Sequence, residues 1–297
     1  MVVTHRGSSR RTAAEPFDLP DDHPGATDPA YRARRAVIAA VGAAHRQGEP
    51  IPDVDYSPEE DAVWAQVSQE LAVQHREHAC AEYLRGAERV VLPTDRVPQL
   101  REVDARTRSL TGFAISPVPG LVPTRDFYGA LAERTFLATQ YIRHHSVPHY
   151  TPEPDIVHEI IGHANMLGSP VLADLYQAAG RASRRTESAA GLEFFSRVFW
   201  FTLEFGVVHE DGDLKAYGAG ILSSFGEIAR YRRATIHPWE PAAMGTRSYD
   251  ITRYQPVLYA APSMTELVDR LGAFFDDFDD DVAASHAASR STSQEPA

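Results

Sequence analysis

Cysteine is almost absent from this 297-residue chain, because Cys80 is its only one. A disulfide framework and a cysteine-based metal site are therefore excluded. Basic residues are also few, with 29 Lys and Arg against 41 Asp and Glu and a formal net charge of −12. This balance argues against nucleic acid or an anionic membrane surface as the main partner, because both require clustered basic side chains.

Long hydrophobic runs are missing as well. The apolar stretch over residues 198–208 is too short for a bilayer, which requires about 20 residues. The first 20 residues lack the apolar segment of a secretory signal. We therefore expect a cytoplasmic protein that has no membrane partner.

The residue patterns that are present predict a mostly helical fold with small β elements. A capping serine, Ser57, is followed by Pro58 and two glutamates, which is a strong helix start. We expect a disordered segment over 1–20, one catalytic domain over 21–280, and a disordered, acidic and low-complexity tail over 281–297. Helical spacing covers 28–47, 57–85, 124–144, 155–166, 170–183, 190–208 and 263–276, and strand signals lie near 113–118, 214–218 and 257–260.

Two histidines and one glutamate predict a metal site. His158 and His163 lie in the segment VHEIIGH (157–163), and Glu204 lies inside the apolar segment FWFTLEFG (199–206). A carboxylate buried without a partner is unfavourable, so Glu204 requires a metal ion or a cation beside it. Two imidazoles and one carboxylate leave three adjacent coordination positions open, as in mononuclear non-haem Fe(II) oxygenases.

The interval of five residues between the histidines distinguishes this segment from a zinc-protease helix, whose histidines are four residues apart. At about 100° per residue, the two side chains point about 140° apart on an ideal α-helix. They can share one ion where the helix widens into a π-type turn, which Gly162 would ease, or where the ion lies to one side. Two alternatives remain open: unrelated helical histidines, and an ion pair between Glu204 and an arginine such as Arg197.

The chain resembles the catalytic domain of the pterin-dependent aromatic amino acid hydroxylases. The resemblance extends from DHPG (22–25) to the helix near 278 and consists of many blocks in the same order. No preceding regulatory domain or C-terminal tetramerisation helix is evident, so we expect a monomer or weak dimer. The blocks include GEPIP (48–52), HACAEYL (78–84), PQL (98–100), TGF (111–113), RDF (125–127), TQYIRH (139–144), TPEPD (151–155), AYGAGILSSFGE (216–227) and YQP (254–256).

The resemblance implies a monooxygenase that hydroxylates the ring of a free aromatic amino acid. Its co-substrates would be O2 and tetrahydrobiopterin or a related reduced pterin, and its metal would be Fe(II), bound by the three ligands predicted above. Arg143 would bind the substrate carboxylate through its guanidinium fork, oriented by Asp155. The other assignments are Thr151, Pro154, Trp200, Phe205 and Ser223 for the substrate; Gly120, Val122, Phe127 and Glu159 for the pterin; Glu159 and Ser223 for catalysis; and Ser224 and Glu227 for orienting ligands.

Two positions predict the substrate. Tryptophan hydroxylases tend to have Phe where this chain has Trp200, and tyrosine hydroxylases carry Asp where it has Ile251. The leading prediction is therefore the conversion of L-phenylalanine to L-tyrosine. For Trp200 and Phe205, ordinary core packing is an equally good interpretation.

Other departures keep further products open. Phe199 and Leu137 replace a tyrosine and a histidine of the animal enzymes, which changes the pocket. The same chemistry giving meta-tyrosine or 5-hydroxytryptophan is therefore the alternative prediction. More distant alternatives are a zinc-dependent hydrolase built on His158, Glu159 and His163, and a helical binding protein whose histidines only pack.

Overall fold

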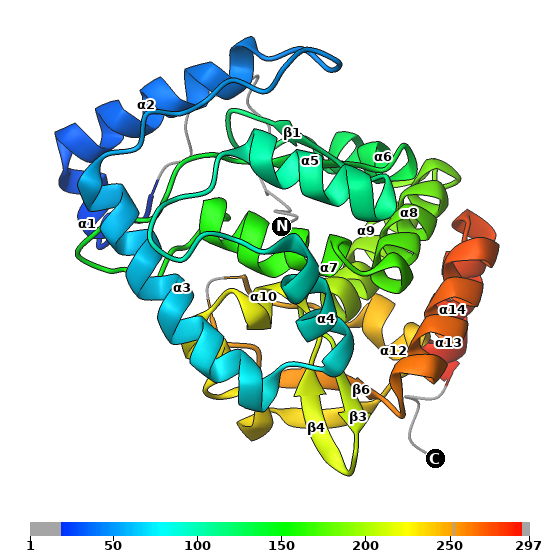
Figure 1. Ribbon diagram of the computed structural model, residues 1–297. Helices are drawn as coiled ribbons and strands as arrows, with labels where there is room; N and C mark the ends of the chain where they lie inside the picture. Colours follow the sequence, from blue (N-terminus) through cyan, green and yellow to red (C-terminus); the bar gives the residue numbers. More distant parts are fainter. Residues whose placement is uncertain (1–18, 252, 293–297) are drawn as a thin grey trace.

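The computed structural model of the protein describes residues 19–251 and 253–292. It is mostly helical, with two small sheets (Figure 1). The helices are α1 (Pro24–Thr27), α2 (Pro29–Ala44), α3 (Pro58–His78), α4 (Ala81–Val90), α5 (Leu100–Thr111), α6 (Thr124–Ala132), the π-helix η1 (His158–Ala164), α7 (Asn165–Leu167), α8 (Pro170–Arg184), α9 (Ala189–Phe199), the π-helix η2 (Trp200–Glu204), α10 (Ala219–Leu222), α11 (Phe225–Ile228), the 3₁₀-helix η3 (Tyr231–Arg233), α12 (Pro241–Thr246), α13 (Met264–Asp277) and α14 (Asp280–Thr292).

The strands form a parallel pair and a four-stranded mixed sheet. The pair consists of β1 (Ala114–Pro117) and β2 (Thr135–Ala138). The larger sheet has the order β4-β3-β6-β5 and consists of β3 (Val207–Glu210), β4 (Asp213–Ala216), β5 (Thr235–Pro238) and β6 (Val257–Ala261). Asp211 and Gly212 connect β3 to β4 with φ angles of 52° and 84°, as a two-residue hairpin turn requires.

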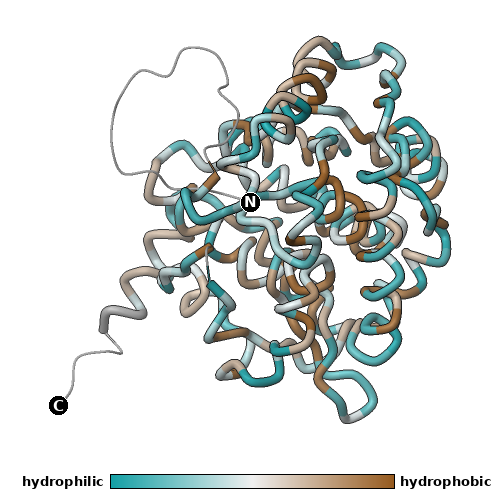
Figure 2. The backbone as a smooth tube through the Cα atoms, turned by 90° about the vertical axis from the view of Figure 1, so that its left-hand side faces the viewer, coloured by the Kyte–Doolittle hydropathy of each residue, from teal (hydrophilic) through white to brown (hydrophobic). Residues whose placement is uncertain are grey.

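The metal-ligand segments lie between these layers. In Figure 1 the four-stranded sheet is at the bottom, α5 and α6 lie in the upper half below α2, and the green segment that contains η1 runs between the sheet and these two helices. Hydrophobic stretches gather inside the molecule and polar ones lie mainly outside (Figure 2). The buried hydrophobic side chains form one large core cluster. It includes residues from most of the helices and strands, among them residues of η1 and η2. Among the described residues, no helix combines the length and the apolar character needed to cross a membrane.

Close packing of α8 against α6 shows why small residues occur in the core. A Cβ added to Gly180 would lie 2.1 Å from the backbone nitrogen of Ala132, so only glycine permits this approach.

The helix start that the sequence predicts at Ser57 is present in α3. Ser57 Oγ accepts from the Glu60 backbone N–H, and the Glu60 carboxylate accepts from the Ser57 N–H, which completes a capping box.

Four predictions from the sequence need correction. The helix predicted over 57–85 is two helices, α3 and α4, and the helix predicted over 190–208 ends at Glu204, before β3. The helix predicted over 124–144 ends at Ala132, because Arg134 adopts a φ of 48° and the chain then pairs with β1 as β2. The tail predicted over 281–297 is helical as far as Thr292, since α14 packs on α9 and α12. Asp280 accepts hydrogen bonds from the residues before α9, and His286 stacks on Phe194, which fixes α14 in place. The remaining predicted ends, 1–18 and 293–297, lie outside the described residues.

Candidate metal centre and adjoining cavity

Both segments that carry the predicted metal ligands are π-helical. His158 and His163 lie on η1, and Glu204 ends η2. Because a π-helix pairs residues five apart, His163 lies one turn after His158 and faces the same side. The widened helix predicted from the five-residue interval is therefore confirmed. Gly162 serves a second purpose, because a Cβ there would lie 2.9 Å from the carbonyl oxygen of Ala219 in α10.

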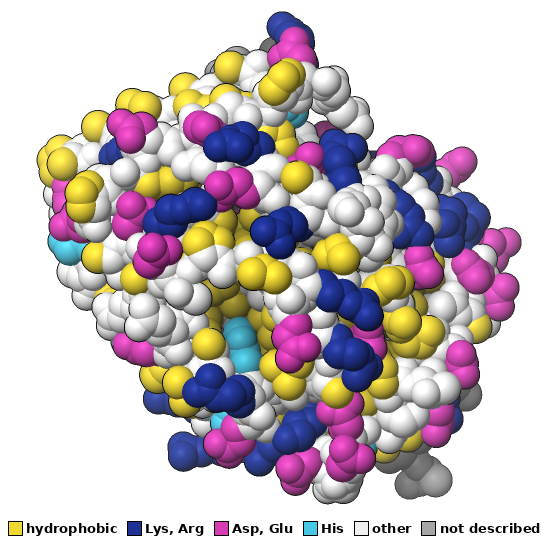
Figure 3. Space-filling view, viewed as in Figure 1, with side chains coloured by type: hydrophobic (Ala, Val, Ile, Leu, Met, Phe, Trp, Pro, Cys, Tyr) yellow, Lys and Arg dark blue, Asp and Glu magenta, His cyan; other side chains and the backbone are white. Residues whose placement is uncertain are grey.

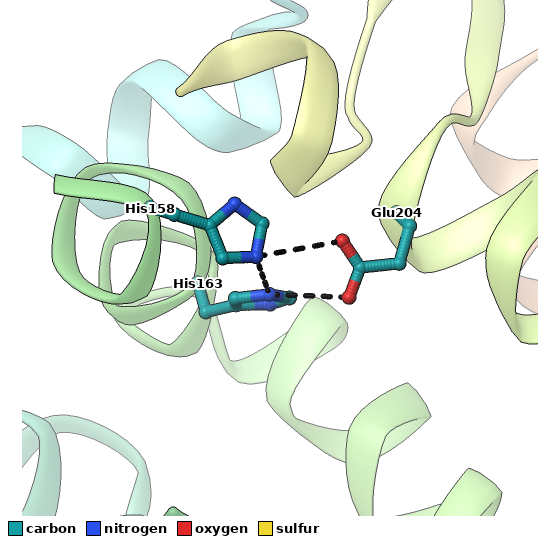
Figure 4. A group of neighbouring side chains, drawn as sticks. All are labelled: His158, His163 and Glu204. Carbon is teal, nitrogen blue, oxygen red and sulfur yellow. Dashed lines mark hydrogen bonds and ion pairs between the residues drawn. The ribbon is translucent and has the colours of Figure 1, made fainter. Parts of the chain in front are cut away.

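The three side chains converge on one point (Figure 4). The two Nε2 atoms of His158 and His163 are 3.0 Å apart, and His163 Nε2 lies 3.2 Å from Glu204 Oε1. His158 Nε2 lies 3.7 Å from Glu204 Oε2. His163 and Glu204 are buried, and His158 is partly exposed. Within the described chain, this is the only group of His, Cys, Asp and Glu side chains whose donor atoms could share one ion.

Hydrogen bonds at the opposite ring nitrogens set the protonation of both histidines. Ser223 Oγ donates to the Ala219 carbonyl at 2.8 Å, so it can only accept from His158 Nδ1 at 2.9 Å. Tyr176 Oη lies 2.7 Å from His163 Nδ1 and donates to the sulfur of Met166. Both Nδ1 atoms then carry the proton, and both Nε2 atoms present lone pairs to each other and to Glu204.

This arrangement fits a divalent cation. Burial lowers the pKa of His158 to about 3, so its imidazole is neutral at physiological pH. Glu204 Oε1 is buried and has no hydrogen-bond donor among the described residues. Two imidazole–metal bonds of about 2.1 Å at right angles place their nitrogens about 3 Å apart, as the two Nε2 atoms are. Two imidazoles and one carboxylate suit iron or zinc better than calcium or magnesium.

A cavity of about 370 Å³ opens beside the three ligands. His158 and Glu204 form part of its wall, so a metal held there would face the cavity directly. On the face of the molecule that Figure 3 draws, acidic and basic side chains are interspersed around a hollow that contains hydrophobic and histidine side chains. The structure places every residue predicted to contact the substrate in the cavity wall except Asp155: these are Arg143, Thr151, Pro154, Trp200, Phe205 and Ser223.

Asp155 lies behind Arg143 and fixes its orientation. Arg143 Nε and Nη2 donate to the two carboxylate oxygens of Asp155 at 2.9 and 2.8 Å, and both side chains are buried. Burial alone would raise the pKa of Asp155, but the guanidinium of Arg143 outweighs it and lowers this pKa. Nη1 of Arg143 donates to the Pro148 carbonyl, so two of the five guanidinium N–H groups remain, one on each terminal nitrogen.

Trp200 and Phe205 form an aromatic part of the cavity wall. The ring of Trp200 lies face to face with Tyr249, with centroids 4.2 Å apart, and contacts Phe205 at 4.4 Å. Trp200 Nε1 donates to Gln255 Oε1 at 3.2 Å. Trp200 and Phe205 are therefore pocket walls as well as core residues. Sequence reasoning missed Tyr249 and Gln255, which lie in a loop with no helical or strand periodicity to identify them.

The four residues assigned to the pterin lie outside this cavity wall. Phe127 packs against Phe136, whose ring in turn contacts the predicted metal ligand His163. The Glu159 carboxylate accepts from the backbone N–H and hydroxyl of Thr139, just after β2, and burial raises its pKa to about 8. Gly120 and Val122 lie partly exposed between β1 and α6. The contacts of Phe127 and Glu159 thus place both beside β2.

Sequence reasoning also missed two side chains that support the π-helix. The Ile161 carbonyl in the middle of η1 accepts from Tyr83 Oη at 2.8 Å and from Asn165 Nδ2 at 3.2 Å. Asn165 Nδ2 also donates to Tyr83 Oη. Because a π-turn distorts the helical hydrogen-bond ladder, side-chain donors to a carbonyl inside it stabilise the widened geometry.

The Tyr83→Phe variant is expected to weaken metal binding without disturbing the ring packing. Losing the bond to Ile161 removes about 1 kcal/mol of stability and loosens η1, and altered ligand support typically lowers metal affinity by about tenfold. Anaerobic Fe(II) titration would measure the affinity. Tyr217→Phe is the matched control, because Tyr217 is buried and its hydroxyl has no hydrogen-bond partner among the described residues. Equal iron affinities in the two variants would contradict this role of Tyr83.

Comparison with known proteins identifies the family. Residues 8–292 match the family described as biopterin-dependent aromatic amino acid hydroxylase. The chain belongs to this family. It is 45% identical over 274 residues to a phenylalanine 3-hydroxylase of Streptomyces coeruleorubidus, covering 92% of this chain and 98% of that protein. It is 50% identical over 212 residues to a chloroplastic phenylalanine 4-monooxygenase of Chlamydomonas reinhardtii, covering 71% of this chain and 58% of that protein.

Solved structures of this hydroxylase family agree with the fold. A phenylalanine hydroxylase of Chromobacterium violaceum with bound iron(III) and 7,8-dihydrobiopterin superposes with a TM-score of 0.74 at 30% identity, covering 82% of this chain and 89% of that one. The predicted fold, with its helices and small sheets in one hydroxylase domain, is confirmed. Family membership also removes the zinc-hydrolase and non-catalytic alternatives.

Proposed function

We propose that this hydroxylase converts free L-phenylalanine to meta-tyrosine. The observation that carries the proposal is the match to the Streptomyces phenylalanine 3-hydroxylase, which extends over 98% of that protein. The match to the algal 4-monooxygenase covers only 58% of its length. The proposal therefore replaces the para product, which the sequence placed first, by the alternative product stated with it.

His158, His163 and Glu204 hold the iron in this proposal. Their geometry fits one ion, and the Chromobacterium relative contains iron(III) together with 7,8-dihydrobiopterin. Iron and reduced pterin would together activate O2, which is the source of the oxygen atom that enters the substrate ring. The protein's own contribution is to keep both Nε2 atoms unprotonated, through Ser223 and Tyr176, and to leave the cavity side of the ion open.

Arg143 binds the substrate carboxylate. Its two remaining N–H groups, one on each terminal nitrogen, form the planar fork that a carboxylate accepts in a bidentate manner. Thr151 and Ser223 supply hydroxyl groups at the same cavity wall. Pro154, Trp200 and Phe205 then enclose the ring, and because His158 and Glu204 border the same space, the ring reaches the metal.

The pterin occupies the side of the metal that borders β2. Phe127 offers a buried ring for stacking, Gly120 and Val122 offer backbone groups, and Glu159 offers a carboxyl one residue after His158. Phe199 packs between Phe127 and Tyr176, so an apolar ring stands where animal members carry a tyrosine. Phe199 is outside the cavity wall but contacts Tyr176, which in turn contacts His163. This change behind the predicted metal ligand supports a changed site of hydroxylation.

Product analysis by liquid chromatography and mass spectrometry tests the proposal. The purified protein receives Fe(II), O2 and an equimolar mixture of phenylalanine, tyrosine and tryptophan, with and without tetrahydrobiopterin. We expect meta-tyrosine that appears only with the pterin. Para-tyrosine would overturn the proposed regiochemistry, 5-hydroxytryptophan would overturn the proposed substrate, and no hydroxylated product from iron-loaded protein would overturn both.

Trp200→Phe is expected to shift substrate preference toward tryptophan. The smaller ring leaves space between Tyr249 and Phe205 for an indole, and a change of this size in an apolar pocket alters selectivity by about tenfold to a hundredfold. The ratio of kcat/KM for tryptophan to that for phenylalanine is the measurement.

Trp64→Phe is the matched control for this selectivity change. Trp64 is also fully buried and also donates through Nε1, but to the Pro93 carbonyl and outside the cavity wall. Its replacement is expected to lower stability and leave the selectivity ratio unchanged. If both variants show the wild-type ratio, Trp200 does not determine the substrate.

A further inference from the structure

An amino acid substrate carries an ammonium group that also needs a partner in the cavity. This inference rests on the proposed function, in which the cavity binds free L-phenylalanine. Arg143 accounts for the substrate carboxylate. A buried ammonium without an anion or strong acceptor beside it is costly, so the cavity should hold a carboxylate in addition to the metal ligand.

Three glutamates line the cavity, and two of them already have cationic partners. Glu153 forms a buried ion pair with Arg35 through one oxygen and accepts from Tyr141 Oη at 3.4 Å through the other. Glu204 belongs to the metal centre. Glu227 on α11 is the third. Glu227 is therefore the one glutamate of the three whose carboxylate is not already paired with a cation or assigned to the metal centre.

The surroundings of Glu227 leave one of its oxygens available. Its side chain is buried, and Oε1 accepts from the Gln255 backbone N–H at 3.0 Å. In the part of the chain that the structure describes, no Lys or Arg nitrogen forms an ion pair with it. The nearby guanidinium of Arg230 instead lies over the Tyr254 ring, 4.6 Å from its centroid. Burial raises the pKa of Glu227 to about 7.

Glu227 is linked by hydrogen bonds both to the polar wall of the cavity and to its aromatic wall. Ser224, which caps α11 through the Glu227 N–H, follows Ser223 on the polar wall. Gln255 donates to Glu227 through its backbone and accepts from Trp200 Nε1 through its side chain. One residue thus positions the carboxylate relative to the aromatic wall. We propose that Glu227 binds the α-ammonium of the substrate and so selects amino acids over aromatic acids that lack an amino group.

The burial of Glu227 explains why the cavity would select amino acids over aromatic acids that lack an amino group. The ammonium group of an α-amino acid supplies the positive charge that stabilises the ionised form of the buried Glu227, whose pKa burial raises to about 7. An aromatic acid of equal shape, such as 3-phenylpropanoate, adds a second negative charge to the cavity and leaves Glu227 without a partner. Glu227 is therefore expected to favour the first ligand and disfavour the second.

Binding to Glu227→Gln tests the proposal. L-phenylalanine and 3-phenylpropanoate, which share the ring and the carboxylate, are titrated by calorimetry into anaerobic, Fe(II)-loaded wild-type and variant protein. Loss of a charge-assisted bond is expected to weaken L-phenylalanine binding by at least about tenfold. Affinity for 3-phenylpropanoate is expected to stay the same or increase, and Glu227→Asp should restore part of the preference for the amino acid.

Two control results make the outcome decisive. Arg143→Lys is expected to weaken both ligands, because both carry the carboxylate. An equal loss of both ligands in Glu227→Gln, or no loss of either, would overturn the proposal and leave Glu227 as a loop-fixing residue. Because binding is measured rather than turnover, a failure of the proposed hydroxylation in the product analysis would be seen separately.

Discussion

Replacing Glu204 by glutamine is expected to remove most of the affinity for Fe(II) while preserving the fold. The side chain is buried, and its carboxylate lies between two imidazole nitrogens that carry lone pairs. Removing one charge from a buried pair corresponds to about 3–5 kcal/mol, so iron affinity should fall by about two to four orders of magnitude. Pterin-dependent hydroxylation should fall with it at limiting iron.

Thermal unfolding provides a second measurement on the same variant. Iron at about a hundred times its dissociation constant adds about 2.7 kcal/mol to the stability of the wild type, and this increment should vanish in Glu204→Gln. Without iron, the variant should be at least as stable as the wild type, because an unpaired buried charge has been removed. Glu153→Gln, at a buried cavity glutamate outside the metal cluster, is the matched control and should retain iron. Normal iron occupancy in Glu204→Gln would contradict the assignment.

Arg143→Lys is expected to raise the KM for phenylalanine by about a hundredfold or more. A lysine ammonium can neither maintain the two-point contact with Asp155 nor present two parallel N–H groups to the substrate. Each lost hydrogen bond to a charged group is worth about 1.5–3 kcal/mol. Since the carboxylate is bound in ground state and transition state alike, KM should change more than kcat.

Arg34→Lys is the matched control for Arg143→Lys. Arg34 contacts Glu60 through Nε and Nη2 at 2.9 and 2.8 Å, the same two-point geometry, but does not line the substrate cavity. Its replacement should leave KM unchanged. A wild-type KM in Arg143→Lys would remove Arg143 from the carboxylate site, and a similar rise in both variants would indicate a general effect of losing an arginine–carboxylate fork.

The sequence was sufficient to single out His158, His163 and Glu204, which the structure brings together, because their signal is local. Two histidines five residues apart on one helical segment imply a widened turn, and a lone glutamate in an apolar run implies a compensating cation. The structure contains the widened turn and places the Glu204 carboxylate beside both histidines. The resemblance to the family then placed Arg143, Thr151, Pro154, Trp200, Phe205 and Ser223, all of which line one cavity.

What the sequence could not predict depends on contacts between distant segments. Ser223 and Tyr176 fix the histidine tautomers, and Tyr83 supports the π-helix, but each acts across a tertiary contact that no periodicity records. The strand β2 was predicted as helix because its apolar residues also suit a helix, and pairing with β1 decides between them. The helix α14 was predicted as a loose tail because its stability comes from Asp280 and His286 contacting α9 and the residues before it.

The structure of the Fe(II)-loaded protein with L-phenylalanine, determined anaerobically, would test the central claim most directly. The claim is that one iron, held by three residues on two π-helices, borders the cavity that binds the amino acid. The predicted result is one iron bonded to Nε2 of His158, Nε2 of His163 and the Glu204 carboxylate, with the substrate carboxylate on Arg143 and its ring against Trp200. Iron bound elsewhere, or phenylalanine bound outside this cavity, would contradict it.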